Sequence, residues 1–189
     1  MSIKPRVILK VVLCGCKEVG KSSILLRASD KKVPDRYVPT IGVDHGLYKC
    51  ISNNQYVTID MWEISGDPRF EGISNTFIAN TNFIIFCFDL SRPKTFLELP
   101  NYIARVERLG KTYGKSIVGI KSDLEKKVFQ GKEYAESIEA SYYEINALHE
   151  SEVIFLMHSI ANDGVINGTY DMVMEEKEED VVANTCCYM

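Results

Sequence analysis

The sequence lacks the features that would assign it to a membrane, nucleic-acid or zinc-binding class. No apolar run is longer than a strand, and the short polar start from Met1 to Arg6 resembles neither a signal peptide nor a membrane span. Lys and Arg total 22 against 26 Asp and Glu, and the net charge of −4 argues against nucleic-acid binding through clustered cations. The six cysteines show no zinc-type spacing. We therefore expect a cytosolic protein whose internal cysteines are free thiols.

The overall composition is that of an ordinary globular domain. The chain has 189 residues, of which 46% are hydrophobic and 25% charged, and this size predicts one domain. Apolar segments of strand length alternate with helical patterns, which predicts an α/β fold with a mostly parallel six-stranded sheet, helices on both faces and one antiparallel edge strand. We expect strands at 7–14, 47–52, 56–62, 83–89, 116–120 and 142–145. We expect helices at 21–28, 73–79, 95–112, 131–140 and 151–161, with Pro100 disturbing or restarting the early turns of the third.

The periodic pattern fades near Asp163, and an acidic run follows at 175–180. These observations predict a folded domain at 1–161 and a flexible acidic tail at 162–189.

A glycine-rich loop joins the first expected strand to the first expected helix. It has the pattern Gly-x4-Gly-Lys-Ser, from Gly15 to Ser22. The glycines allow backbone N–H groups to surround phosphate oxygens, and the start of the helix adds its positive dipole end. Lys21 would neutralise the β- and γ-phosphates, and the Ser22 hydroxyl would be a magnesium ligand. The pattern predicts a nucleotide-phosphate site; the alternative is a glycine turn without a ligand.

Further motifs extend this prediction to a family. The segments Tyr37–Asp44 and Met61–Phe70, and the shorter Phe88–Pro93 and Val118–Asp123, lie where the Ras superfamily of small GTPases has its motifs. The chain resembles that superfamily, and most of all the Rab family, over residues 7–161. The resemblance implies a P-loop NTPase fold and the cofactors GTP or GDP with Mg²⁺.

The resemblance also implies roles for individual residues. Thr40 would ligate magnesium and sense the γ-phosphate, although a polar turn beside Pro39 would also explain it. Tyr37 would close over the nucleotide, and Glu63 would hold magnesium through a water molecule, with Ser22 and Thr40 as direct ligands. The implied nucleotide contacts are Gly15, Glu18, Val19, Gly20, Lys21, Ser22, Ser23, Tyr37, Thr40, Gly66, Lys121, Asp123, Ala147 and Leu148.

The chain departs from the family pattern at the residues that carry the chemistry. Asp67 replaces the glutamine that orients the attacking water, and a carboxylate can only accept hydrogen bonds where an amide also donates. This predicts slow hydrolysis, with Lys21 still assisting; the alternative is that Asp67 serves as a general base. Lys17 and Glu18 are bulky and would crowd an arginine finger. Glu63 replaces a shorter aspartate, which predicts altered magnesium binding.

The residues expected around the base are altered too. Lys121 and Asp123 match the Asn-Lys-x-Asp motif that reads guanine, but Ile120 cannot supply the amide of its first residue. Val33 stands where an aromatic ring usually stacks on the base. Leu148 replaces a lysine, next to Ala147, whose backbone N–H would reach the guanine oxygen. We expect guanine binding that is weaker than in other Rab proteins.

The end of the chain, Cys186-Cys187-Tyr188-Met189, resembles a prenylation signal. Either one or both thiols would carry a lipid, and the acidic run at 175–180 favours two, because anionic lipid would repel it. The alternative is a pair of unmodified cysteines.

The sequence as a whole suggests a Rab-like guanine-nucleotide switch in vesicle and membrane trafficking. It would present 41–44 and 69–73 to effectors, use an exchange factor and a lipid-masking chaperone, and occupy the cytoplasmic face of an intracellular membrane with a cytosolic pool. The main alternative is a pseudo-GTPase scaffold without a nucleotide cycle. A nucleotide kinase or motor-type ATPase fits less well, because the chain has no room for a lid or an added domain.

Overall fold

A computed structural model describes residues 6–36, 38–109 and 113–173 of the chain. The strands are β1 Arg6–Gly15, β2 Val43–Ser52, β3 Gln55–Ile64, β4 Phe83–Asp89, β5 Gly114–Ile120, β6 Ser141–Ile145 and β7 Asp171–Val173. The α-helices are α1 Lys21–Ala28, α2 Glu71–Ala79, α3 Pro93–Leu97, α4 Leu99–Glu107, α5 Gly131–Ser137 and α6 Glu150–Ile166, and a short 3-10 helix spans Pro68–Phe70. Tyr37, Cys186, Cys187 and the acidic run at 175–180 lie outside the described residues.

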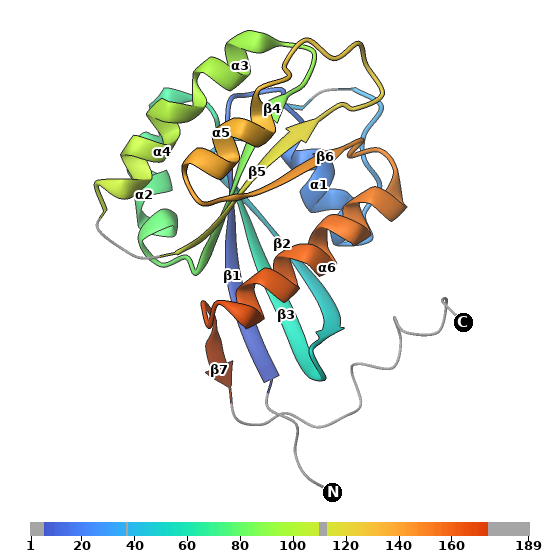
Figure 1. Cartoon of the computed structure of the whole chain (residues 1–189), viewed down its shortest axis with the longest axis vertical. Coiled ribbons are helices and arrows are strands. Elements are labelled where there is room, and N and C mark those ends of the chain that lie inside the picture. Colours follow the sequence, from blue (N-terminus) through green and yellow to red (C-terminus); the bar gives the residue numbers. More distant parts are fainter. Residues whose placement is uncertain (1–5, 37, 110–112, 174–189) are drawn as a thin grey trace, which may run out of the picture.

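All strands belong to one sheet with the order β2-β3-β1-β4-β5-β6 (Figure 1). The pairs from β3 to β6 are parallel, and β2 is the antiparallel edge strand, which confirms the expected α/β architecture. Its hairpin turns at Asn53 and Asn54, whose φ angles of 48° and 61° are the left-handed values that such a turn requires.

The sheet has a seventh strand that the sequence did not predict. β7 pairs antiparallel with Arg6–Ile8 of β1, on a stretch that β4 leaves open because its own pairing with β1 begins at Val11. Residues beyond the expected boundary at Ala161, as far as Val173, therefore take part in regular secondary structure. α6 continues to Ile166 because its last turn is still packed: Val165, and Tyr170 beyond the helix, contact the buried core.

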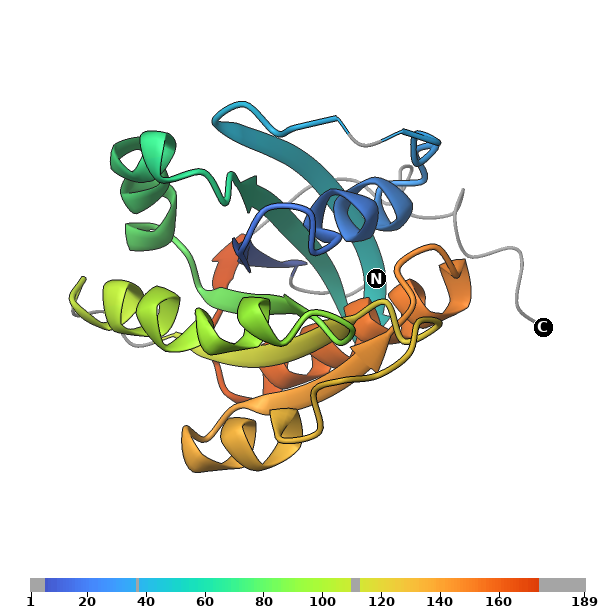
Figure 2. The same cartoon turned by 90° about the horizontal axis from the view of Figure 1, so that it is seen from above.

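Helices cover both faces of the sheet (Figures 1 and 2). Alternate residues of β1 point to opposite faces, as a strand buried on both sides requires. Val7, Leu9, Val11 and Leu13 join a core with α1 and α6, while Val12 and Cys14 join a second core with α2, α4 and α5. The loops that follow the carboxyl ends of the parallel strands lie at one edge of the sheet, where ligands bind in such folds.

Some predicted helix bounds were wrong. The single helix expected at 95–112 is two helices that meet at Glu98, and Pro100 lies in the first turn of the second, where its missing N–H is tolerated. The last helix begins at Glu150 with His149 as its N-cap, in place of the expected Ser151. No helix within the described ranges has the length and apolar character needed to cross a bilayer.

Candidate functional site

The glycine-rich loop between β1 and α1 follows a path that only glycine permits at its first position. Gly15 has a φ of 145°, and a Cβ there would lie 2.2 Å from the backbone oxygen of Cys87 on β4. Gly66, at the end of β3, approaches the loop equally closely, since a Cβ on it would lie 2.4 Å from the Lys17 nitrogen. The loop is therefore fixed against two neighbouring strands, with the first turn of α1 behind it.

Lys21 is the buried cation of this loop, with only 4% of its surface exposed. Its Nζ donates hydrogen bonds to the backbone oxygens of Gly15 at 2.9 Å and Cys16 at 2.7 Å. An ammonium group has three donors, so one remains for an anion within the loop. A buried positive charge at the start of a helix is an arrangement suited to a phosphate group.

Three oxygen-bearing side chains meet beside Lys21. The hydroxyls of Ser22 and Thr40 donate to the same Glu63 oxygen, Oε1, at 2.8 Å and 3.1 Å, and lie 3.2 Å from each other. Glu63 is 2% exposed, and its other oxygen, Oε2, has no hydrogen-bond partner among the described residues. Burial raises the pKa of Glu63, while Lys21 and the two hydroxyls act in the opposite direction.

This oxygen set fits a magnesium ion. Neighbouring ligands of octahedral magnesium, with bonds of about 2.0–2.1 Å, are roughly 3 Å apart, close to the 3.2 Å between the Ser22 and Thr40 hydroxyls. The partnerless, buried Oε2 atom adds an acceptor that a metal or a metal-bound water would satisfy. The extra methylene of Glu63 thus does not remove its carboxylate from the two hydroxyls.

A cleft of about 650 Å³ opens in front of these groups. Most of the predicted nucleotide contacts line it, namely Glu18, Gly20, Lys21, Ser22, Ser23, Thr40, Gly66, Lys121 and Leu148, and so does the predicted metal contact Glu63. Gly15, Val19 and Ala147 are buried next to it, and Asp123 is exposed on the turn after β5. One cleft therefore joins the phosphate end, at Lys21, to the end predicted to hold the base, where Val33 and Leu148 lie.

Comparison with known proteins identifies the family. The Ras family model matches residues 10–164, which is most of the chain. The chain belongs to the Ras family. It is 31% identical over 170 residues to Ras-related protein RabC of Dictyostelium discoideum, covering 85% of this chain and 86% of the relative.

Two other Rab-named proteins of that organism give a similar picture. Ras-related protein Rab-1A is 29% identical over 151 residues, or 77% of this chain and 75% of the relative. Ras-related protein RabV is 32% identical over 126 residues, or 66% of this chain and 54% of the relative. These matches confirm a Rab-like small GTPase, whose family generally binds GTP or GDP with Mg²⁺.

Asp67, which the sequence predicted to replace the water-orienting glutamine, is paired with a residue of its own loop. The Asp67 carboxylate accepts hydrogen bonds from the Arg69 backbone N–H at 3.0 Å and from its guanidinium at 2.7–3.1 Å. These bonds lower the pKa of Asp67 to about 2. Asp67 does not line the cleft. A carboxylate with so low a pKa is a weak base, which does not favour the general-base alternative.

The base end of the cleft is held by contacts that the sequence did not reveal. Ile120 is buried and packs on the loop, with Cγ2 3.0 Å from the position a Cβ of Gly20 would take. The Asn146 side-chain oxygen accepts from the Leu148 backbone N–H at 3.0 Å, and the Asn146 backbone N–H donates to the Glu152 carboxylate at 2.7 Å. Glu152 also pairs with the His149 ring nitrogen Nδ1 at 2.8 Å, and no motif in the sequence pointed to either contact.

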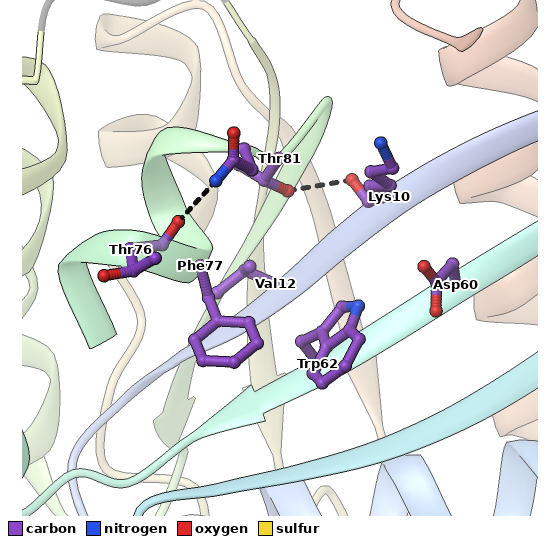
Figure 3. A pocket seen from close by; sticks show the side chains of 8 residues that line it. Lys10, Val12, Asp60, Trp62, Thr76, Phe77 and Thr81 are labelled. Carbon is purple, nitrogen blue, oxygen red and sulfur yellow. Dashed lines mark hydrogen bonds between the residues drawn. The ribbon is translucent and has the colours of Figure 1, made fainter. Parts of the chain in front are cut away.

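The loops predicted to meet effectors present apolar and aromatic groups. Ile41, next to Thr40, is 81% exposed. On β2 and β3, His45 stacks on Trp62 with ring centroids 4.3 Å apart, and Trp62 contacts Phe77 of α2 at 4.8 Å. A second cavity of about 230 Å³ lies beside Trp62 and Phe77, between β1, β3 and α2 (Figure 3).

Proposed function

We propose that the protein is a guanine-nucleotide switch that binds GTP and GDP with Mg²⁺ and hydrolyses GTP slowly. The observation that carries the proposal is the meeting of Ser22, Thr40 and Glu63. Ser22 belongs to the phosphate loop, Thr40 to the segment before β2, and Glu63 to β3. Whatever occupies the phosphate end of the cleft is therefore linked to the exposed segment that begins at Ile41.

Different residues of the cleft would bind the phosphates, the metal ion and the base. Lys21 would neutralise the β- and γ-phosphates, and the Gly66 N–H would donate to the γ-phosphate. Ser22 and Thr40 would hold Mg²⁺ directly and Glu63 through a water molecule, and the ion would supply positive charge to the phosphate oxygens. At the other end, Lys121, Asp123 and the Ala147 N–H would read guanine, with Val33 in place of a stacking ring.

Slow hydrolysis follows from the position of Asp67. Its carboxylate is paired with Arg69 and does not line the cleft, and it cannot donate a hydrogen bond to the transition state. Lys17 and Glu18 line the cleft and would hinder an arginine supplied by a partner. Turnover would then depend on a factor that repositions this segment.

The proposed cellular role is in membrane trafficking, through effectors that contact 41–44 and 69–73, an exchange factor and a lipid-masking chaperone. Lipids on Cys186 and Cys187 would attach the protein to the cytoplasmic face of an intracellular membrane. Support comes from the direction of β7: it runs antiparallel to β1, so Val173 pairs with Arg6, at the end of β1 opposite Gly15 (Figure 1). An anchor beyond Val173 would start far from the nucleotide cleft.

The binding proposal is tested by titrating the purified chain with fluorescent GDP and GTP, with Mg²⁺ and with EDTA. We expect saturable binding that Mg²⁺ strengthens and that Lys21→Ala reduces by at least about tenfold, because it removes a buried charge partner of phosphate. Lys31→Ala, an exposed lysine after α1, is the matched control. No saturable binding at millimolar nucleotide would leave the pseudo-GTPase scaffold as the function.

The membrane proposal needs a separate test. Mass spectrometry of the C-terminal peptide from the native cell should show prenyl groups on Cys186, Cys187 or both. Unmodified thiols would remove the membrane role and leave the nucleotide proposal intact.

A further inference from the structure

Arg92, in the turn after β4, contacts two segments that are far apart in the sequence. Its guanidinium donates to the Glu18 backbone oxygen at 2.8 Å and to Asp89 Oδ2 at 2.8 Å. A longer contact of 3.4 Å reaches the Glu18 carboxylate. Arg92 thus joins the phosphate loop to the carboxyl end of β4, using the fixed fork geometry of its guanidinium.

Asp89 links Arg92 to Lys121, which lies at the base end of the cleft. Its side chain is 1% exposed, and Oδ2 also contacts the Lys121 Nζ at 2.7 Å. Its Oδ1 accepts from the backbone N–H and the hydroxyl of Ser91 at 2.9 Å and 2.6 Å. A buried carboxylate with two cations and two further donors is fully satisfied, so it forms a rigid junction.

Next to Lys121 in the chain is the position at which the family has an asparagine and this protein has Ile120. Ile120 precedes Lys121 and makes only apolar contact with Gly20 of the phosphate loop. Glu18 also has a φ of 65°, in the left-handed region that residues with a Cβ rarely adopt. A donor on its carbonyl would hold the loop in that conformation.

From this geometry we propose that Arg92 is a positioning residue that ties the phosphate loop to the base-reading segment 121–123, in place of the side-chain amide that Ile120 lacks. The inference rests on the proposed guanine-nucleotide binding. Glu18 and Lys121, the two ends of the tie, both line the nucleotide cleft. Arg92 itself would not touch the nucleotide; it would keep the phosphate-binding and base-binding ends at a fixed separation and so slow nucleotide release.

The test is a double-mutant cycle on nucleotide dissociation. Arg92→Ala should speed the release of fluorescent GDP about tenfold, the effect of losing a charge-assisted pair of hydrogen bonds. Arg92→Lys, which keeps the charge and loses the fork, should be intermediate. The exposed Lys94→Ala, two residues further along, should match the wild type.

Ile120→Asn separates this tie from a general loss of stability. If Arg92 substitutes for the missing amide, Ile120→Asn should slow release markedly in the Arg92→Ala background and much less in the wild type. Release from Arg92→Ala equal to that from Lys94→Ala, or an equal effect of Ile120→Asn in both backgrounds, would overturn the proposal.

Hydrogen exchange on nucleotide-free protein keeps the inference distinct from the proposed function. Arg92→Ala should speed exchange of the amides at 17–20 and 121–124, with β5 and β6 unchanged. If the wild type bound no guanine nucleotide, the proposed function would fail. The positioning role of Arg92 would still be tested by the exchange rates of these amides. Unchanged exchange in both loops would refute the tie.

Discussion

The Thr40 hydroxyl donates a hydrogen bond of 3.1 Å to the Glu63 carboxylate, and this contact connects an exposed loop to a buried strand. Thr40 precedes Ile41, the most exposed large apolar side chain among the residues that the structure describes. Glu63 is 2% exposed and also accepts from Ser22. The chain thereby places its proposed metal ligands and part of its proposed partner surface on adjacent residues.

Glu63→Gln should weaken Mg²⁺ binding about tenfold or more, since the amide keeps an acceptor and loses the charge. The measurement is the rate of GDP release as a function of free Mg²⁺. The exposed Glu133→Gln on α5 serves as a control for charge alone. A Mg²⁺ dependence identical in both variants would exclude Glu63 from the metal site.

Asp67→Gln should raise single-turnover GTP hydrolysis by about tenfold or more, because the amide can accept from water and donate to the transition state. It also breaks the ion pair with Arg69. Asp67→Asn loses the same charge but is one methylene shorter, so it should recover less. If both variants gained equally, repulsion by the carboxylate would be the cause of slow turnover, and orientation of water would not.

Val33→Phe should tighten guanine-nucleotide binding by roughly 1–3 kcal/mol, or about five- to 150-fold, if the ring stacks on the base. Val33 lines the cleft, whereas Leu47 is exposed on the edge strand β2. Leu47→Phe therefore adds an aromatic ring without reaching the site. Equal affinities for wild type and Val33→Phe would mean that the base does not lie against Val33.

The sequence predicted the architecture well because its main signals are local. The strand at 83–89 and the helix at 21–28 have the predicted bounds, since each is a continuous pattern next to glycine or polar turns. The loop from Gly15 to Ser22 was recognisable because its chemistry needs residue types at fixed spacing.

What the sequence did not reveal depends on contacts between distant segments. β7 has three residues, and its pairing with β1 follows from where β4 begins. Arg92 and Glu18 are 74 positions apart, and no pattern in the sequence indicates that they contact each other. The contact between Arg69 and Asp67 is local in the sequence. It depends on how the two side chains are oriented in a loop, and no periodic pattern predicts that orientation.

Asp89 should contribute to stability in a pH-dependent way. Burial would raise its pKa, but hydrogen bonds from Lys121 and Ser91 outweigh burial and lower the pKa below its ordinary 3.8. The ionised form therefore stabilises the fold above about pH 3.8, and this contribution is lost as the pH falls through the folded pKa.

Asp89→Asn should accordingly lower the urea midpoint at pH 7, and the difference from wild type should shrink towards pH 3. Glu136→Gln, an exposed carboxylate at the end of α5, provides the comparison. A difference between wild type and Asp89→Asn that stayed constant over this range would show that Asp89 acts through packing and not through its charge.

The end of the folded domain can be tested by truncation. A chain ending at Val173 should unfold at nearly the temperature of the full-length protein, because it retains β7 and its pairing with β1. A chain ending at Ala161 loses the last turn of α6 and β7, and with them the packing of Val165 and Tyr170 on the core. Burial of two such side chains contributes on the order of 2–4 kcal/mol, so thermal unfolding should shift down by several degrees. Equal unfolding temperatures for the two truncations would show that residues after Ala161, β7 included, do not contribute to the stability of the fold.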